Sequence, residues 1–326
     1  MVQHTVAIVG SGPAGYSAAL YTSRANLKTL IFAGDEPGGQ LMKTTEVENY
    51  PGFSIGIVGP NLMGQMQQQA VRFGAELVWE TVTKIRNKKS ETRNKFEMET
   101  NAGKTYTADA VILAMGAKSK LLGVGEEAYF GKGFSTCAVC DAPFYKDKNV
   151  YVVGGGDAAI EDAWALTKFA KTVTMLVRGE SFRASKIMQK RITDNPDKIK
   201  VLWKSSLKGV RGERVEQLVL DVDGAEKVVS TEGLFLAIGH LPATEFLVDS
   251  GVALDERGYI KNLMTYPPEK VTTESYWLTH HPTMTSVEGI FAAGDCVDFR
   301  YRQAATAAGM GVSAALDAEK WLENGS

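Results

Sequence analysis

The chain has 326 residues, with 44% hydrophobic and 23% charged side chains, which is enough for two globular domains with cores of their own. Lysine and arginine number 36 against 38 acidic residues, so the charge gives no reason to expect a nucleic-acid partner. No apolar run approaches the roughly 18 residues of a membrane span. The first residues carry no secretion signal, so we expect a cytoplasmic protein without a membrane partner.

The N-terminal segment predicts a strand at 5–9, a glycine turn, a helix at 13–25 and a second strand at 28–32. The stretch 34–64 that follows is dense in glycine, proline, threonine and asparagine. Long irregular stretches of this kind inside a compact domain usually contact a ligand. A further helix is expected at 60–73, where the apolar residues return to helical spacing.

Later segments repeat this plan. Residues 149–179 again read as strand, glycine turn, helix and strand, which indicates an internal duplication of a nucleotide-binding unit. Both 108–118 and 233–240 predict buried strands that run into Ala-x-Gly. The chain closes with a strand within 289–298 that runs into Gly-Asp, and with a helix from about Gln303.

The domain boundaries are expected just after the two Ala-x-Gly strands, near 118 and 244. No low-complexity linker separates the parts of the chain. The second unit is therefore predicted to be inserted into the first.

The first glycine turn, Gly10-x-Gly12-x-x-Gly15, lies between a predicted strand and a predicted helix. In this context the glycines permit a tight turn and a close approach of the backbone to a pyrophosphate, which the helix N-terminus faces. The alternative is a glycine-rich turn without a ligand. Asp35 and Glu36 lie near the spacing of a ribose-binding acid, but beyond the strand that should present it.

The second glycine turn is Gly154-x-Gly156-x-x-Ala159, and its second strand is followed by Arg178 and Arg183. An arginine at this place suits the 2′-phosphate of NADPH. The alternative is that both arginines merely lie on a solvated loop. Two dinucleotide units in one chain indicate two redox cofactors, a flavin and a nicotinamide.

Two of the three cysteines, Cys137 and Cys140, flank two residues and precede Asp141. Such a pair is typical of a redox dithiol, whose thiolate attacks a disulfide while the second cysteine resolves the mixed intermediate, and a neighbouring carboxylate can move the proton. A zinc site would need two more ligands, and neither Cys296 nor the four histidines lie at ligand spacing. An inert buried pair would leave the acid and the duplicated units unexplained.

The sequence resembles the low-molecular-weight, bacterial-type thioredoxin reductases over nearly its whole length. The stretches that carry the resemblance are 10–27, 38–53, 137–145, 154–163 and 289–309. It implies an α/β fold of two Rossmann-like three-layer (ββα) domains, the second inserted into the first, and a homodimer.

The implied FAD-binding domain comprises 1–117 and 245–326, and the implied pyridine-nucleotide-type domain with the redox cysteines comprises 118–244. Cys140 matches the cysteine nearest the flavin, Cys137 the one that exchanges with thioredoxin or a thioredoxin-like protein, and Asp141 the acid that moves the proton. The positions implied for FAD are Gly10, Ser11, Gly12, Pro13, Ala14, Gly15, Gly39, Gln40, Leu41, Thr45, Asn49, Gly116, Gly294, Asp295, Arg302, Gln303 and Ala304. The positions expected for NADPH are Gly154, Gly156, Asp157, Ala158, Arg178 and Arg183.

The sequence departs from the family in two places. The family's NADPH signature is His-Arg-Arg-x-x-x-Arg, whereas 177–183 reads Val-Arg-Gly-Glu-Ser-Phe-Arg. The electron donor therefore stays open between NADPH and another donor such as ferredoxin, with a flavin-bound redox sensor as a third reading.

The stretch 265–286 is longer than usual and rich in aromatic residues, either as a surface or dimer loop or as a cover for the flavin. Cys296 is expected to be a small buried residue.

Overall fold

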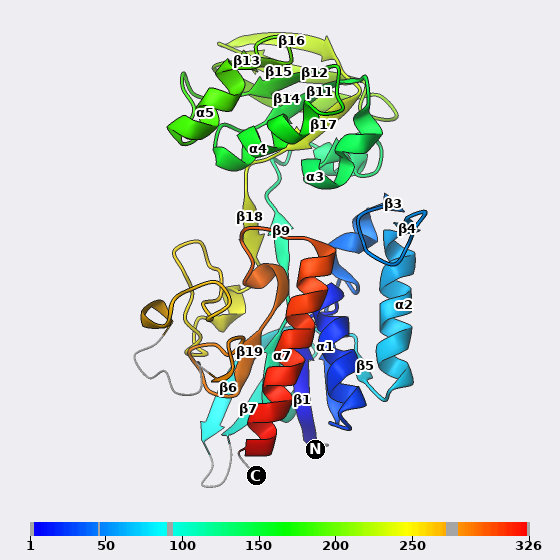
Figure 1. Cartoon of the computed structure of the whole chain (residues 1–326), viewed down its shortest axis with the longest axis vertical. Helices are drawn as coiled ribbons and strands as arrows, with labels where there is room; N and C mark the ends of the chain where they lie inside the picture. Colours follow the sequence, from blue (N-terminus) through cyan, green and yellow to red (C-terminus); the bar gives the residue numbers. More distant parts are fainter. Residues whose placement is uncertain (1–2, 45, 90–93, 272–279, 325–326) are drawn as a thin grey trace. The chain divides into compact units, whose positions relative to one another are not determined.

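The computed structural model describes residues 3–44, 46–89, 94–271 and 280–324. The chain divides into two compact units: a discontinuous unit of residues 1–118 and 241–326, and an inserted unit of residues 119–240. Figure 1 shows both units.

The discontinuous unit is built on a largely parallel sheet. In the described part of the chain its strand order is β5-β2-β1-β8-β7-β6, with β19 pairing with β8. The strands of this sheet are β1 (Gln3–Val9), β2 (Thr29–Phe32), β5 (Glu76–Val78), β6 (Val82–Lys89), β7 (Asn94–Thr100), β8 (Thr105–Leu113) and β19 (Ile290–Ala292). The helices are α1 (Pro13–Arg24), α2 (Gly59–Arg72) and α7 (Ala304–Asn324), with short 3-10 turns η1 (Gly39–Lys43), η4 (Glu245–Leu247), η5 (Pro268–Lys270) and η6 (Gly294–Cys296). A small hairpin pairs β3 (Glu46–Val47) with β4 (Ile57–Val58).

Helices cover one face of this sheet, as Figure 1 shows for α1, α2 and α7. The second half of strand β1, residues 6–9, is a continuous apolar run, as expected for a parallel strand buried on both faces. Val6 and Ile8 pack with the helices, while Ala7 and Val9 face the core formed with β6 and β7. The position of β1 fixes the glycine turn that follows it.

The approach of α7 to α1 requires a glycine. A Cβ at Gly311 would lie 2.1 Å from the carbonyl oxygen of Ala14 in α1, whereas a Cβ at Gly309 would have no atom within 4 Å. Because the obstacle is backbone, it cannot rotate away. Gly311 thus allows α7 to lie against the first turn of α1.

Gly311→Ala is expected to lower the free energy of unfolding by about 2 kcal/mol or more, as overpacking against a rigid neighbour does. Gly309→Ala in the same helix should be neutral or stabilising by about 0.5–1 kcal/mol, since alanine favours helix. Urea unfolding of the two variants checks the pair. Equal stabilities would show that the helices can separate at no cost.

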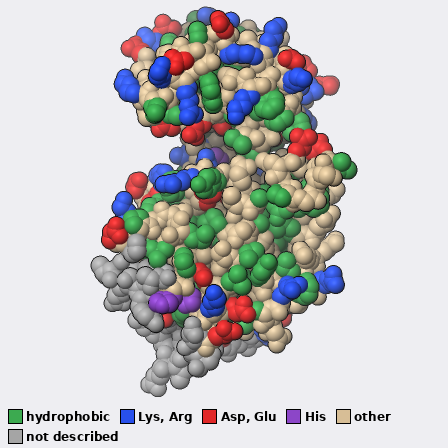
Figure 2. All heavy atoms as spheres, viewed as in Figure 1, with side chains coloured by type: hydrophobic (Ala, Val, Ile, Leu, Met, Phe, Trp, Pro, Cys, Tyr) green, Lys and Arg blue, Asp and Glu red, His purple; other side chains and the backbone are tan. Residues whose placement is uncertain are grey.

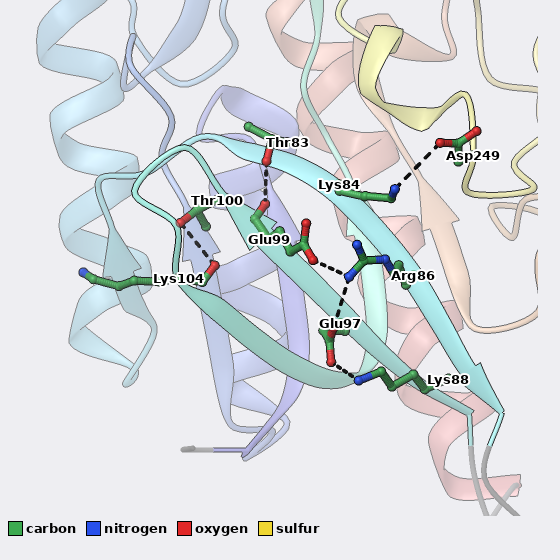
Figure 3. A network of polar contacts seen from close by, with 9 residues as sticks. All are labelled: Thr83, Lys84, Arg86, Lys88, Glu97, Glu99, Thr100, Lys104 and Asp249. Atoms are coloured by element: carbon green, nitrogen blue, oxygen red, sulfur yellow. Dashed lines mark hydrogen bonds and ion pairs between the residues drawn. The ribbon is translucent and has the colours of Figure 1, made fainter.

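A ladder of charged side chains crosses the hairpin of β6 and β7, and Figure 3 shows it from close by. Arg86 pairs with Glu97 and Glu99, and Lys88 pairs with Glu97. Lys84 lies 3.8 Å from Asp249, which follows η4. Such largely exposed pairs contribute little each, but cross-strand charges of opposite sign favour this register of the hairpin.

The inserted unit has a parallel sheet and an antiparallel one. The parallel sheet has the order β10-β17-β11-β12-β13 and the antiparallel sheet the order β14-β15-β16 in the residues described. The strands are β10 (Phe134–Ser135), β11 (Asn149–Val153), β12 (Thr172–Leu176), β13 (Ile199–Leu202), β14 (Ser205–Arg211), β15 (Gln217–Val222), β16 (Ala225–Ser230) and β17 (Gly233–Leu236). The helices are α3 (Ala138–Asp141), α4 (Asp157–Leu166) and α5 (Lys186–Thr193), with 3-10 turns η2 (Glu126–Tyr129) and η3 (Ala142–Tyr145).

The predicted fold class, with two Rossmann-like units and one inserted into the other, is confirmed. The predicted strand at 108–118 is wrong at its end, because β8 stops at Leu113 and Gly116 adopts a left-handed φ of 72°.

The chain crosses between the units in β9 (Ala117–Ser119) and β18 (His240–Pro242), which pair with each other. No helix among the described residues is long and apolar enough to cross a membrane. Acidic and basic side chains are interspersed on the face that Figure 2 draws.

Candidate functional site

The two cysteines of the predicted redox pair form a disulfide. Cys137 is the N-cap of the short helix α3, and Cys140 lies in its single turn, so the Cα atoms are 5.3 Å apart. The backbone N–H of Cys140 donates a hydrogen bond of 3.3 Å to the Cys137 sulfur. Both residues are partly exposed. The helical turn therefore holds the two sulfurs together at a place that another molecule can reach.

Asp141 ends α3, and its backbone N–H donates to the Cys137 carbonyl at 3.2 Å. Burial raises the pKa of its carboxyl, and a hydrogen bond from the Ser135 hydroxyl opposes this rise. The same hydroxyl accepts a hydrogen bond of 3.0 Å from the Cys137 N–H. Ser135 is buried at the end of β10, and no sequence motif singles it out. A carboxyl with a raised pKa can hold a proton beside the disulfide.

The first glycine turn has the shape predicted for a pyrophosphate loop. Gly12 is the N-cap of α1, and no side chain caps the helix, so the first N–H groups of α1 are free to bind an anion. A Cβ at Gly15 would lie 2.0 Å from the carbonyl oxygen of Gly10, and Gly10 has a φ of 111°. Ser11 fixes the loop by donating to the Ala33 carbonyl at 2.8 Å. Pro13 and Ala14 are the first two residues of the helix.

Segments distant in the sequence meet at this turn. A Cβ at Gly39, in η1 with Gln40 and Leu41, would lie 3.5 Å from the Cα of Gly12. The Asn49 side chain donates to the Gln303 side-chain oxygen at 3.3 Å across 254 positions of sequence. The predicted position Thr45 lies outside the described residues.

Asp295 carries the side-chain atom of the discontinuous unit that tells most about its ligand. It lies in η6 after Gly294, and its Oδ1 atom is buried with no hydrogen-bond partner among the described residues. Burial, followed by the nearby Asp298 carboxylate, raises its pKa to about 7, and the Arg302 charge opposes the shift. A buried acceptor without a donor is costly, so this atom indicates a missing ligand with hydroxyl or amide donors. Arg302 and Ala304 flank Gln303 in the segment that begins α7.

The second glycine turn, in the inserted unit, repeats this geometry. Gly154 has a φ of 147°, and Gly156 is the N-cap of α4 without a side-chain cap. Asp157 and Ala158 open the helix, but the Asp157 carboxylate already accepts two hydrogen bonds from Ser185, of 2.8 and 2.9 Å. This carboxylate therefore tethers α5 to α4.

Arg178 and Arg183 lie on the loop after β12, and the described residues offer neither guanidinium an ion pair. The Arg183 N–H donates to the Gly155 carbonyl at 2.8 Å, which fixes the loop against the glycine turn. Two free cations beside a helix N-terminus suit a ligand with more than one phosphate.

The remaining sequence features have simpler roles. Cys296 is fully buried, and burial raises the pKa of its thiol to about 12, so it is an inert packing residue. The described residues contain no group of three or more side chains that could hold a metal ion. Tyr266, in the long aromatic stretch, donates to Asp255 at 2.7 Å. Tyr276 and Trp277 of that stretch lie outside the described residues.

Comparison with known proteins gives the class. Residues 4–311 match the family model described as pyridine nucleotide-disulphide oxidoreductase. Thioredoxin reductase of Mycolicibacterium smegmatis is 47% identical over 98% of this chain and 96% of its own. Solved structures of thioredoxin reductase from Giardia duodenalis (40% identity, TM-score 0.85, 99% of this chain and 100% of that one) and Streptococcus pyogenes (37%, 0.86, 99% of each) are also similar.

The fold, the glycine turns and the disulfide thus define a flavin-dependent disulfide oxidoreductase of the class that the family model describes. Within this class, the chain belongs to the thioredoxin reductase family. The sequence-based predictions of family, enzyme class and FAD as cofactor are confirmed.

Proposed function

We propose that the protein reduces the disulfide of thioredoxin through Cys137 and Cys140, with FAD bound in the discontinuous unit. The observation that carries this proposal is the Cys137–Cys140 disulfide followed directly by a half-buried acid, Asp141, in a chain of the thioredoxin reductase family. The relatives named thioredoxin reductase support thioredoxin as the substrate.

The residues of the discontinuous unit fit FAD. The turn of Gly10 to Gly15 and the N-terminus of α1 would hold its pyrophosphate. The orphaned Oδ1 atom of Asp295 would accept from its hydroxyl groups. The other positions that we propose for FAD are Gly39, Gln40, Leu41, Asn49, Gly116, Arg302, Gln303 and Ala304, of which Gly39 lies against Gly12 and Asn49 bonds to Gln303. When bound, FAD supplies the two-electron redox centre that the side chains lack.

The cysteines of the reduced protein would exchange with thioredoxin in two steps. The Cys137 thiolate attacks one sulfur of the thioredoxin disulfide, forming a mixed disulfide and releasing the other thioredoxin sulfur as a thiolate. The Cys140 thiolate then attacks Cys137, which reforms the intramolecular disulfide and releases the second thioredoxin thiolate. Two electrons and two protons leave the protein. We assign the handling of one proton to Asp141, whose burial favours the protonated form.

We propose NADPH as the electron donor, bound at the glycine turn of the inserted unit. Its support is the uncapped N-terminus of α4, with Arg178 and Arg183 on the loop whose backbone bonds to the glycine turn. The competing donor, a reduced ferredoxin, is favoured by Gly179 and Glu180, which stand where the family signature has an arginine and a variable residue.

Anaerobic mixing with NADPH separates the two donors. The flavin absorbance in the visible band is expected to bleach on mixing, because hydride transfer reduces the ring system. An unchanged spectrum, with bleaching only after chemically reduced ferredoxin is added, would assign the ferredoxin donor. Bleaching by NADPH with no reduction of added thioredoxin would indicate that the protein is a flavin-bound redox sensor.

We further propose a cytosolic homodimer. A dithiol that must stay reducible suits a reducing compartment. The homodimer is proposed from the resemblance to the thioredoxin reductase family. Sedimentation equilibrium would measure the state of association.

A further inference from the structure

The loop that follows β12 is held by a turn from another part of the inserted unit. Lys204 lies between β13 and β14, and its N–H donates to the Gly179 carbonyl at 3.1 Å. The next residue, Ser205, donates to the Val177 carbonyl at 3.0 Å. These two bonds lock the turn onto the loop that carries Arg178.

The lysine side chain in this turn is paired with the only acid of the loop. Lys204 Nζ lies 2.7 Å from Glu180 Oε1, and 3.7 Å from Asp223 Oδ1. Lys204 itself has a left-handed φ of 47°, and its carbonyl accepts from the Asp223 N–H at 2.9 Å. The backbone at both ends of the ion pair is therefore fixed by hydrogen bonds, which reduces the entropy lost when the side chains meet.

The position of Glu180 in the Rossmann unit matters for the recognition of the nucleotide. In a Rossmann unit, residues after the second strand meet the adenosine ribose, where an acid accepts from a 2′-hydroxyl and an arginine accommodates a 2′-phosphate. An unpaired Glu180 would repel the 2′-phosphate of NADPH and would offer NADH a hydrogen-bond acceptor. With its carboxylate held by Lys204, the loop keeps two free cations, Arg178 and Arg183.

We infer that Lys204 is a specificity-determining residue that holds Glu180 and thereby lets this loop prefer a 2′-phosphorylated nucleotide. The inference rests on the proposed NADPH donor and names the residue that makes that choice.

The test measures binding of the oxidised nucleotides NADP⁺ and NAD⁺ to the flavin-loaded protein by titration calorimetry, without turnover. Lys204→Met is expected to weaken NADP⁺ binding by about two- to fivefold, the range for one largely exposed charge contact. NAD⁺ binding should not weaken, because NAD⁺ has no 2′-phosphate to be repelled and the freed Glu180 carboxylate can accept from its 2′-hydroxyl. The effect should shrink as salt rises, since exposed charges are screened.

Two further variants make the result specific. Lys208→Met is the matched control, because Lys208 on β14 pairs with Asp221 at 3.6 Å on the neighbouring strand. It should leave both affinities unchanged. Adding Glu180→Gln to Lys204→Met should restore most of the NADP⁺ affinity, since it removes the charge that Lys204 masks. A misfolded turn would instead weaken both nucleotides and would not be rescued.

The outcomes separate this inference from the proposed function. If the unmodified protein binds NADP⁺ but Lys204→Met loses no preference for it, or loses both nucleotides equally without rescue, the inference is wrong and NADPH stays the donor. If the unmodified protein shows no preference for NADP⁺ over NAD⁺, the proposed NADPH donor and the inference both fall.

Discussion

Replacing Cys140 with serine is expected to lower the rate of thioredoxin reduction by at least about a thousandfold, because a hydroxyl cannot close the disulfide that ends each exchange. Flavin binding should be unchanged, because Cys140 belongs to the inserted unit while the residues assigned to FAD belong to the discontinuous unit. The measurement is steady-state reduction of thioredoxin, normalised to the flavin content from the visible spectrum.

The third cysteine provides the control for this experiment. Cys296 is completely buried, and its thiol pKa of about 12 keeps it protonated. Cys296→Ala should retain a rate per flavin within about twofold of the original, with a loss of stability of about 1 kcal/mol from the small cavity. If Cys140→Ser kept full reductase activity, the redox role of the pair would have to be given up.

Those parts of the site that depend on local sequence could be predicted from it. The turn from Gly10 to Gly15 is one example, because the steric need for glycine arises within six residues of chain. The redox turn is another, since two residues between Cys137 and Cys140 fit one turn of helix. Asn49 and Gln303 were each expected to contact FAD from the family resemblance and not from any local pattern, and the hydrogen bond between them was not predicted.

The parts that sequence reasoning missed depend on side chains brought together by the fold. Lys204 follows Glu180 by 24 positions and belongs to a turn between two strands, so no spacing rule links them. Ser135 contacts the redox turn from the end of a strand of only two residues. The extent of the strand expected at 108–118 was also overestimated, because its apolar run continues past the point where Gly116 needs a left-handed backbone.

Without flavin, the protein is expected to become less stable as the pH rises from about 4 to about 7, because of Asp295. Its carboxyl has a pKa of about 7 in the folded state, compared with 3.8 for an unperturbed aspartate side chain. The folded state therefore binds the proton more tightly than the unfolded chain does. The stabilisation is fully present below the lower pKa and is lost as the pH passes through the higher one, amounting to about 4 kcal/mol.

Asp295→Asn separates this contribution from every other titration, because the amide has nearly the same shape and no charge. Urea unfolding of the flavin-free protein at pH 5 and pH 8 should show a steeper loss of stability for the original chain than for the variant. Parallel pH dependence in both would mean that Asp295 is hydrated or paired in solution. Rebinding FAD should flatten the slope of the original chain, because hydroxyl donors at Oδ1 stabilise the carboxylate that burial alone disfavours. The buried Oδ1 atom without a hydrogen-bond donor would then lower the stability of the flavin-free protein, and bound FAD would remove this loss.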